Sequence, residues 1–277
     1  MRFVRGRRNK RRVCGMMNIS RSTVYYKRKA RNIDPVEELV LEIFDAHNSN
    51  YGCPRIKVVL EEREIGISKR RIGKILKKNN RESKHGRRKL AKNIHTAVKD
   101  RYVAENLIRG YTAAGSNEVC QLDTTQFGSK EGKLYVCGII DIYDRTVGVG
   151  YGLAENKTLI SGTISERIKR GAPMVIHSDR GAANVSLKVK ELLQKNDILQ
   201  SMSAPHSPNE NQYIETFWKT MKTEIGDTKH LTREQLIMVI NYYIHYYNIE
   251  RLHSSIGYTT PHKKFLSGLA RRESNAA

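Results

Sequence analysis

The chain has 277 residues, enough for about two or three folded modules, and its 39% hydrophobic content is typical of a folded protein. Lys and Arg outnumber Asp and Glu by 50 to 28, a net charge of +22. Most of this excess lies in the first 100 residues, which hold 28 basic and 10 acidic side chains. The asymmetry predicts a polyanionic partner, because basic side chains that neutralise phosphates release condensed counterions.

Cysteine usage and hydropathy exclude several classes of protein. The four cysteines are far apart and form no Cys-x-x-Cys pair, which argues against a zinc ribbon or a disulfide framework. The basic start MRFVRGRRNKRR is not followed by a sustained apolar run, so we expect neither a signal peptide nor a membrane span. A cytoplasmic protein without a membrane partner is the expectation.

Residues 1–33 are predicted to form a basic arm with a helix-turn-helix-like segment. Ser20 is placed to cap a short helix over 21–28, whose exposed face carries Arg21. A turn before a short capped basic helix is typical of a recognition helix.

Residues 34–80 predict a cleaner helix-turn-helix domain, with helices over 35–47, 54–64 and 69–79 and Ser68 as the last cap. Apolar residues at helical spacing in the second and third helices predict a small shared core, formed by Ile56, Val59, Leu60, Ile72, Ile75 and Leu76. The outward face of the third helix is basic and carries Lys69, Arg70, Arg71, Lys74, Lys77 and Lys78. We interpret it as a nucleic-acid contact, the alternative being a merely solvated surface.

Residues 81–117 are basic and weakly patterned, and we expect a linker that orders on nucleic acid. In the segment that begins at Glu118, three runs rich in β-branched and aromatic residues are joined by short links and predict an antiparallel meander. Helices and strands then alternate in the order βββαβαβα, which predicts a ribonuclease-H-like α/β catalytic domain over 118–277 with a C-terminal helical extension.

Three carboxylates stand out in this domain. Asp123 lies inside the first predicted strand, Asp179 just after the fourth, and Glu215 on the helix after the fifth. Three carboxylates on neighbouring elements repel unless cations sit between them, and hard cations with oxygen ligands are Mg²⁺ or Mn²⁺. Two such ions would suit in-line phosphoryl transfer.

Spacing and motifs carry a family resemblance over nearly the whole chain. Asp123 and Asp179 are separated by 55 residues, and Asp179 and Glu215 by 35, as in the D-D-35-E signature of integrases and transposases. HSDRG at 177–181, SMSAPHSPNENQYIETFWKTMKTE at 201–224 and YNIERLHSSIGYTTPHKKF at 247–265 resemble motifs of the second-frame transposases of the IS-three group of bacterial insertion sequences. Residues 48–76 resemble the helix-turn-helix of that group.

The resemblance implies a DDE transposase that frees 3′ ends of double-stranded DNA and joins them to element ends or to a target. It implies metal-ligand and catalytic roles for Asp123, Asp179 and Glu215, with two Mg²⁺ or Mn²⁺ ions. Lys219 and Lys222 would face DNA phosphate, unless they are only ion-pair partners of Glu215. Arg251 and His253 would organise the edge of the active site or the DNA, the alternative being a polar turn.

The same resemblance implies a homo-oligomer on DNA, association with the bacterial nucleoid, and an upstream-frame product as a further partner or fused segment. Two other functions fit these sequence features. One is a structure-specific nuclease of the same fold, and the other is a catalytically inactive DNA-binding repressor.

Overall fold

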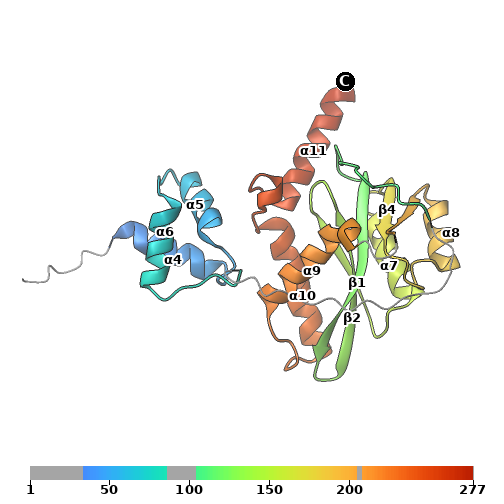
Figure 1. Cartoon of the computed structure of the whole chain (residues 1–277), viewed down its shortest axis with the longest axis horizontal. Coiled ribbons are helices and arrows are strands. Elements are labelled where there is room, and N and C mark those ends of the chain that lie inside the picture. Colours follow the sequence, from blue (N-terminus) through green and yellow to red (C-terminus); the bar gives the residue numbers. More distant parts are fainter. Residues whose placement is uncertain (1–33, 86–103, 205–207, 277) are drawn as a thin grey trace, which may run out of the picture.

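The computed structural model describes residues 34–85, 104–204 and 208–276, which form a small helical unit beside a larger α/β unit (Figure 1). Residues 1–33, with Arg21 and the predicted helix over 21–28, lie outside the described residues. None of the helices in these three ranges is long and apolar enough to cross a membrane.

The helical unit consists of α4 (Pro35–Ala46), α5 (Cys53–Glu62) and α6 (Lys69–Lys78). The predicted cap of α6 is confirmed, because the Ser68 hydroxyl accepts a hydrogen bond from the Arg71 amide at 3.2 Å. The predicted core is also confirmed: Ile56, Leu60 and Ile72 are fully buried, and Val59 packs against them from a half-buried position.

The α/β unit is built on one five-stranded sheet in the order β3-β2-β1-β4-β5. Its strands are β1 (Val119–Ser129), β2 (Gly132–Asp141), β3 (Val147–Gly152), β4 (Val175–Ser178) and β5 (Leu199–Met202). The first three strands are antiparallel, whereas β4 and β5 run parallel to β1. The predicted strand and helix order and the ribonuclease-H-like fold are confirmed.

Helices cover both faces of the sheet (Figure 1). They are α7 (Lys157–Ile168), α8 (Leu187–Lys195), α9 (Gln212–Ile225) and α10 (Arg233–Ile249), followed by α11 (Pro261–Ala276), with short 3-10 turns at Pro208–Asn211 and Ser254–Ile256. Side chains alternate along β2, so that Leu134 and Val136 pack with α9 and α10 while Cys137 and Ile139 pack with α7 and α8. Both faces of β2 are therefore buried.

Two boundaries differ from the sequence-based expectations. The helix expected over roughly 183–195 begins only at Leu187, because Asn184 and Val185 turn back on the Gly181 carbonyl. The sequence predicts that 81–117 orders on nucleic acid, but its described parts, 81–85 and 104–117, are bound to folded elements: Lys84 donates to the Ser49 carbonyl, and Met202 donates to the Glu105 carbonyl.

Candidate active site

Asp123 and Asp179 lie side by side where two parallel strands meet. β1 and β4 are paired with Leu122 opposite Ser178, so Asp123 is the next residue on β1 and Asp179 is the residue that follows β4. Neighbouring strands are about 4.8 Å apart, which brings the two backbones into close proximity. Asp179 also follows the last residue of β4, so it lies at the carboxyl end of that strand, where α/β sheets commonly bind ligands.

Glu215 is held beside this pair by the way α9 begins. Gln121, almost fully buried on β1, accepts hydrogen bonds from the Tyr213 and Ile214 amides at 2.9 and 3.3 Å. Its own amide donates to the Glu210 carbonyl at 2.8 Å. Gln121 therefore satisfies two otherwise unpaired amides of the first helical turn and attaches that turn to β1 two residues before Asp123.

A second contact lets α9 lie close to the sheet. Gly138 pairs directly with Asp123 across β1 and β2, and a Cβ at this position would lie 2.5 Å from the Trp218 ring. Only a residue without a side chain allows this approach. Neither Gln121 nor Gly138 is singled out by sequence reasoning, because their roles depend on α9, about 80 to 90 residues further along the chain.

The electrostatics of the site are those of crowded carboxylates. Burial first, then the charge of Asp179 and that of Glu215, raise the pKa of Asp123 to about 7. Burial also raises the pKa of Glu215. Glu155, which follows β3, adds to the repulsion on Asp123, and burial and the charge of Asp179 raise its own pKa. Glu155 is not identified from the sequence, where an acid before a helix cap resembles ordinary loop chemistry.

Asp179 is held by its own loop. Its Oδ1 accepts from the Gly181 amide at 2.9 Å and from the Asn184 side chain at 2.6 Å. A Cβ on residue 181 would lie 2.9 Å from that same oxygen, so Gly181 permits the turn. The buried Oδ1 of Asn184 has no hydrogen-bond partner among the described residues.

These groups fit a divalent cation in chemistry but are not gathered around one point. Within the described ranges, no three His, Cys, Asp or Glu side chains converge closely enough to hold a metal ion. The donor set of carboxylate oxygens is nevertheless the kind that Mg²⁺ and Mn²⁺ prefer, and a cation would relieve the repulsion that raises the pKa of Asp123.

Lys222 is directed to the same strand as Asp123. Its Nζ donates to the Thr125 hydroxyl at 2.6 Å and lies 5.5 Å from the centre of the Phe127 ring. Lys219 is exposed one turn earlier. Among the described residues, no ion pair joins either lysine to Glu215, so the alternative of a simple ion-pair stripe along α9 receives no support.

The basic face of α6 is exposed, and two of its basic side chains form ion pairs with acidic residues. Arg71 pairs with Asp34 at 2.6 Å, and Lys78 pairs with Glu37. Lys69, Arg70 and Lys74 are exposed on the same short helix. These three cations are therefore available to an external anion.

Arg251 and His253 are both buried, so the structure gives no support to a direct contact of either side chain with DNA. They are 3% and 8% exposed. Arg251 forms an ion pair with Glu224 at 2.6 Å, and the His253 ring packs edge-on against Tyr247. The motif that contains them therefore makes an internal contact. The pairing partner of Arg251 lies 27 residues earlier, and sequence reasoning does not connect the two.

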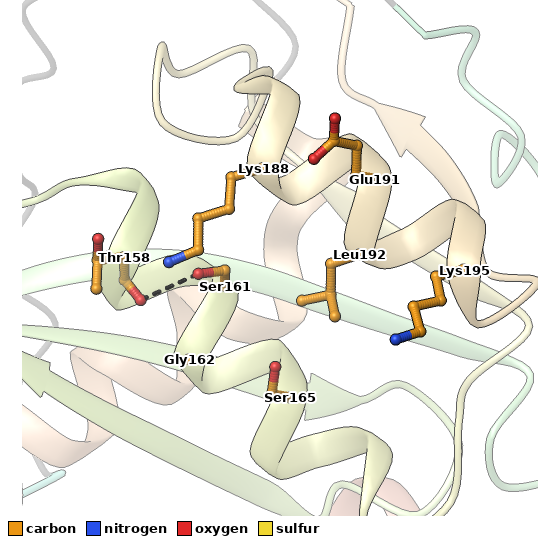
Figure 2. A pocket seen from close by; sticks show the side chains of 8 residues that line it. All are labelled: Thr158, Ser161, Gly162, Ser165, Lys188, Glu191, Leu192 and Lys195. Atoms are coloured by element: carbon orange, nitrogen blue, oxygen red, sulfur yellow. Dashed lines mark hydrogen bonds between the residues drawn. The ribbon is translucent and has the colours of Figure 1, made fainter.

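A pocket of about 410 Å³ lies between α7 and α8 (Figure 2). It is lined by Thr158, Ser161, Gly162, Ser165, Lys188, Glu191, Leu192 and Lys195. Figure 2 shows the Ser161 hydroxyl bonded to the Thr158 carbonyl, at 3.3 Å, and so engaged within its own helix. None of the three site carboxylates lines this pocket.

Comparison with known proteins matches both the helical unit and the sheet of the α/β unit. Two models described as integrase core domain match residues 113–208 and 196–261, and a model described as HTH-like domain matches residues 32–89. A solved simian T-cell lymphotropic virus intasome, in complex with a regulatory subunit of PP2A, shares the fold. Its TM-score is 0.50 at 16% identity, covering 82% of this chain and 74% of that chain.

Curated relatives include transposases of insertion sequences. An uncharacterized transposase-like protein of Haemophilus influenzae is 34% identical over 166 residues, covering 58% of this chain and 76% of the relative. The transposase for insertion sequence element IS904 of Lactococcus lactis is 29% identical, covering 82% and 91% respectively. Transposase InsF for insertion sequence IS3A of Escherichia coli is 26% identical, covering 81% and 80%. The chain therefore belongs to the IS3 group of insertion-sequence transposases, a family of DNA transposition proteins with an integrase core domain.

Proposed function

We propose that this chain cleaves the ends of an insertion sequence and joins the freed 3′ ends to DNA, using Asp123, Asp179 and Glu215 as metal ligands. The observation that carries the proposal is that Asp179 and Glu215 lie near enough to Asp123 for their charges to raise its pKa. The paired register of β1 and β4 and the Gln121 contact to α9 bring together residues that are far apart in the sequence.

The chain's own groups would prepare the reaction. The loop amide of Gly181 and the side chain of Asn184 orient the Asp179 carboxylate. Bound Mg²⁺ or Mn²⁺, in a pair, would stabilise charge on the attacking and leaving oxygens of an in-line displacement. Lys222, which lies two turns after Glu215 on α9 and donates to Thr125 on β1, would hold a phosphate of the DNA strand near Asp123. Lys219 would extend that contact.

The N-terminal segments would hold the element ends. The basic arm (1–33) and the helix-turn-helix domain (34–80) precede the catalytic domain (118–277). The exposed cations Lys69, Arg70 and Lys74 on α6 are suited to phosphate contacts. Arg21 is proposed as a further contact on the basis of the sequence alone. Because each DNA end needs a catalytic site, we propose that the protein acts as a homo-oligomer on DNA.

The test uses the full chain and a duplex with the inverted repeat that flanks its reading frame, in Mg²⁺ or Mn²⁺. Nicking at the repeat end, followed by a covalent DNA–DNA product, is the expected outcome. Asp179→Asn should abolish both steps and still bind the duplex. Asp197→Asn is the matched control, because Asp197 is a loop aspartate in a left-handed conformation that Asn also tolerates.

Two other outcomes would replace the proposal. Nicking without any joined product would indicate a structure-specific nuclease. Binding alone, with no cleavage by the unaltered chain in either metal, would indicate a DNA-binding repressor.

A further inference from the structure

The far end of the catalytic helix α9 carries a fully buried carboxylate that receives hydrogen bonds from three different parts of the chain. The Glu224 side chain accepts from Arg251 at 2.6 Å and from the Tyr243 hydroxyl at 3.0 Å. The Nε2 of His85 lies 2.6 Å from the same carboxylate. Because an ionised carboxylate only accepts hydrogen bonds, His85 must be the donor.

His85 belongs to the helical unit rather than to the catalytic domain. It follows α6 by a short segment in which the Lys84 amide donates to the Ser49 carbonyl at 3.1 Å, so the segment is attached to the helical unit. The side chain of Lys84 reaches across and donates to the Glu224 carbonyl at 2.8 Å. The side chains of two successive residues of the DNA-binding unit therefore form hydrogen bonds with one residue of α9.

The residues just after α10 complete the junction. The Tyr51 hydroxyl donates to the Glu250 carbonyl at 3.2 Å and accepts from the Leu252 amide at 3.1 Å. Arg55 donates to the Leu252 carbonyl at 2.8 Å. The Leu252 side chain is buried in the core of the helical unit. Arg251, between these contacts in the sequence, binds Glu224.

This junction is connected to the active site through a stiff element. Glu224 lies nine residues after Glu215 on the same helix, a separation of about 14 Å along its axis. α9 is attached to β1 at its first turn through Gln121, and Lys222 lies two residues before Glu224. A small displacement at one end of a short helix moves its other end, because interior packing is close to that of a solid.

We infer that Glu224 is a positioning residue through which the DNA-binding helical unit sets the placement of α9, and with it Glu215 and Lys222. The inference rests on the proposed function. In this arrangement the His85 contact transmits DNA binding to the catalytic helix. Element DNA held by the helical unit steadies α9, whereas unrelated DNA does so less. Cleavage is then favoured on the correct DNA without any further base contact in the catalytic domain.

The experiment changes His85, the donor at the edge of the junction. Replacing Glu224 itself would leave the buried Arg251 without its ion-pair partner and risk misfolding. His85→Ala removes the hydrogen bond, and His85→Gln keeps a donor. His262→Ala is the matched control, since His262 is an exposed histidine on α11. Each full-length variant is given a duplex with the flanking inverted repeat and a scrambled duplex of equal length and composition.

The first readout is the ratio of cleavage rates on the two duplexes. We expect His85→Ala to lower this ratio at least tenfold, with affinity for the repeat duplex within threefold of the parent. His85→Gln should recover most of the ratio, and His262→Ala should leave it unchanged. If His85→Ala retained the ratio, or lost repeat binding in proportion to cleavage, the inference would be wrong.

The second readout does not need catalysis. In an Asp179→Asn background, hydrogen exchange of the amides in 212–225 is measured with and without the repeat duplex. We expect the duplex to slow exchange there, and His85→Ala to remove that protection without loss of binding. Equal protection in the two proteins would overturn the coupling. A chain that cleaves nothing would count against the proposed function, while this arm would still decide on the role of Glu224.

Discussion

Asp123 is a side chain at which folding stability and the proposed metal binding oppose each other. It lies on the face of β1 that α9 covers, since Gln121 contacts the start of that helix and Phe127 lies in the core beneath it. Burial and two neighbouring acids raise its pKa to about 7. Folding without a cation therefore works against the charge that metal binding requires.

That conflict predicts a pH-dependent stability. The folded pKa of Asp123 lies above its ordinary value of 3.8, so its stabilising contribution is complete below that value and is lost as pH rises through 7. Asp123→Asn removes the cost. We expect it to raise the melting temperature at pH 8 without divalent ions, by about 2–4 °C for each kcal/mol recovered.

The measurement is thermal unfolding at pH 4 and pH 8, with and without Mn²⁺. The gain from Asp123→Asn should be much smaller at pH 4, where the wild-type carboxyl is mostly protonated when folded. Mn²⁺ should raise the melting temperature of the wild type and not that of the variant. A variant that is less stable than the wild type at pH 8 would contradict this account.

Lys222 supplies the second prediction for a single side chain. Its ammonium group is held by Thr125 on the strand of Asp123, so its loss should affect the reaction more than end binding. We expect Lys222→Gln to lower the cleavage rate at saturating DNA at least tenfold, about 1.4 kcal/mol in transition-state stabilisation.

Two variants qualify this test of Lys222. Lys222→Arg should retain more activity, because it keeps the positive charge. Lys263→Gln, which changes an exposed lysine on α11, should behave as the wild type. Equal rates for Lys222→Gln and Lys263→Gln would remove Lys222 from the site.

The packing of α9 on the sheet determines where Glu215 and Lys222 stand. This packing depends on Gly138 having no side chain, because the Trp218 ring occupies the space where a Cβ would lie. Gly138→Ala would place a methyl group 2.5 Å from that ring and 3.3 Å from Ile214. We expect a loss of about 1–3 kcal/mol in unfolding free energy, as for other overpacked cores, together with lower cleavage.

Gly162→Ala on α7 is the control for Gly138→Ala. A Cβ at Gly162 meets nothing within 4 Å, so alanine should be neutral or stabilising by up to about 1 kcal/mol in this helix. Urea unfolding of both variants tests the comparison. Similar losses in both would show that glycine flexibility, rather than the contact with Trp218, matters at residue 138.

The two units of the molecule are joined through Glu224, and this junction predicts a loss of folding stability at low pH. Burial by itself would raise the pKa of Glu224, but hydrogen bonds from His85 and Arg251 and their charges outweigh burial and lower it to about 2. A lowered pKa contributes stability above the ordinary value of 4.5, and that contribution is lost as pH falls towards 2.

Glu224→Gln is expected to lose this contribution. At pH 7 it should be less stable than the wild type by about 3–5 kcal/mol, the usual cost of breaking one side of a buried ion pair. The difference should shrink between pH 4.5 and pH 2, as the wild-type carboxylate becomes protonated. Urea unfolding at pH 7, 4.5 and 3 measures it, and a difference independent of pH would contradict the ion-pair explanation.

Much of the architecture is readable in the residues alone, because it depends on local patterns. The capped helices, the alternating strands and the order of elements follow from periodicity and capping, as with Ser68 before α6. The carboxylates Asp123, Asp179 and Glu215 are singled out by their spacing and by their places on predicted elements.

Contacts between distant parts of the chain are not readable in that way. Arg251, expected to organise the active-site edge or the DNA, forms a buried ion pair with Glu224, and His85, in the segment expected to be a linker, is part of the same cluster. Gln121 and Gly138 carry no local signal, yet they position α9 on the sheet. The physical reason is that periodicity records which face of an element is buried, whereas the partner buried against that face is selected only when the whole chain packs together.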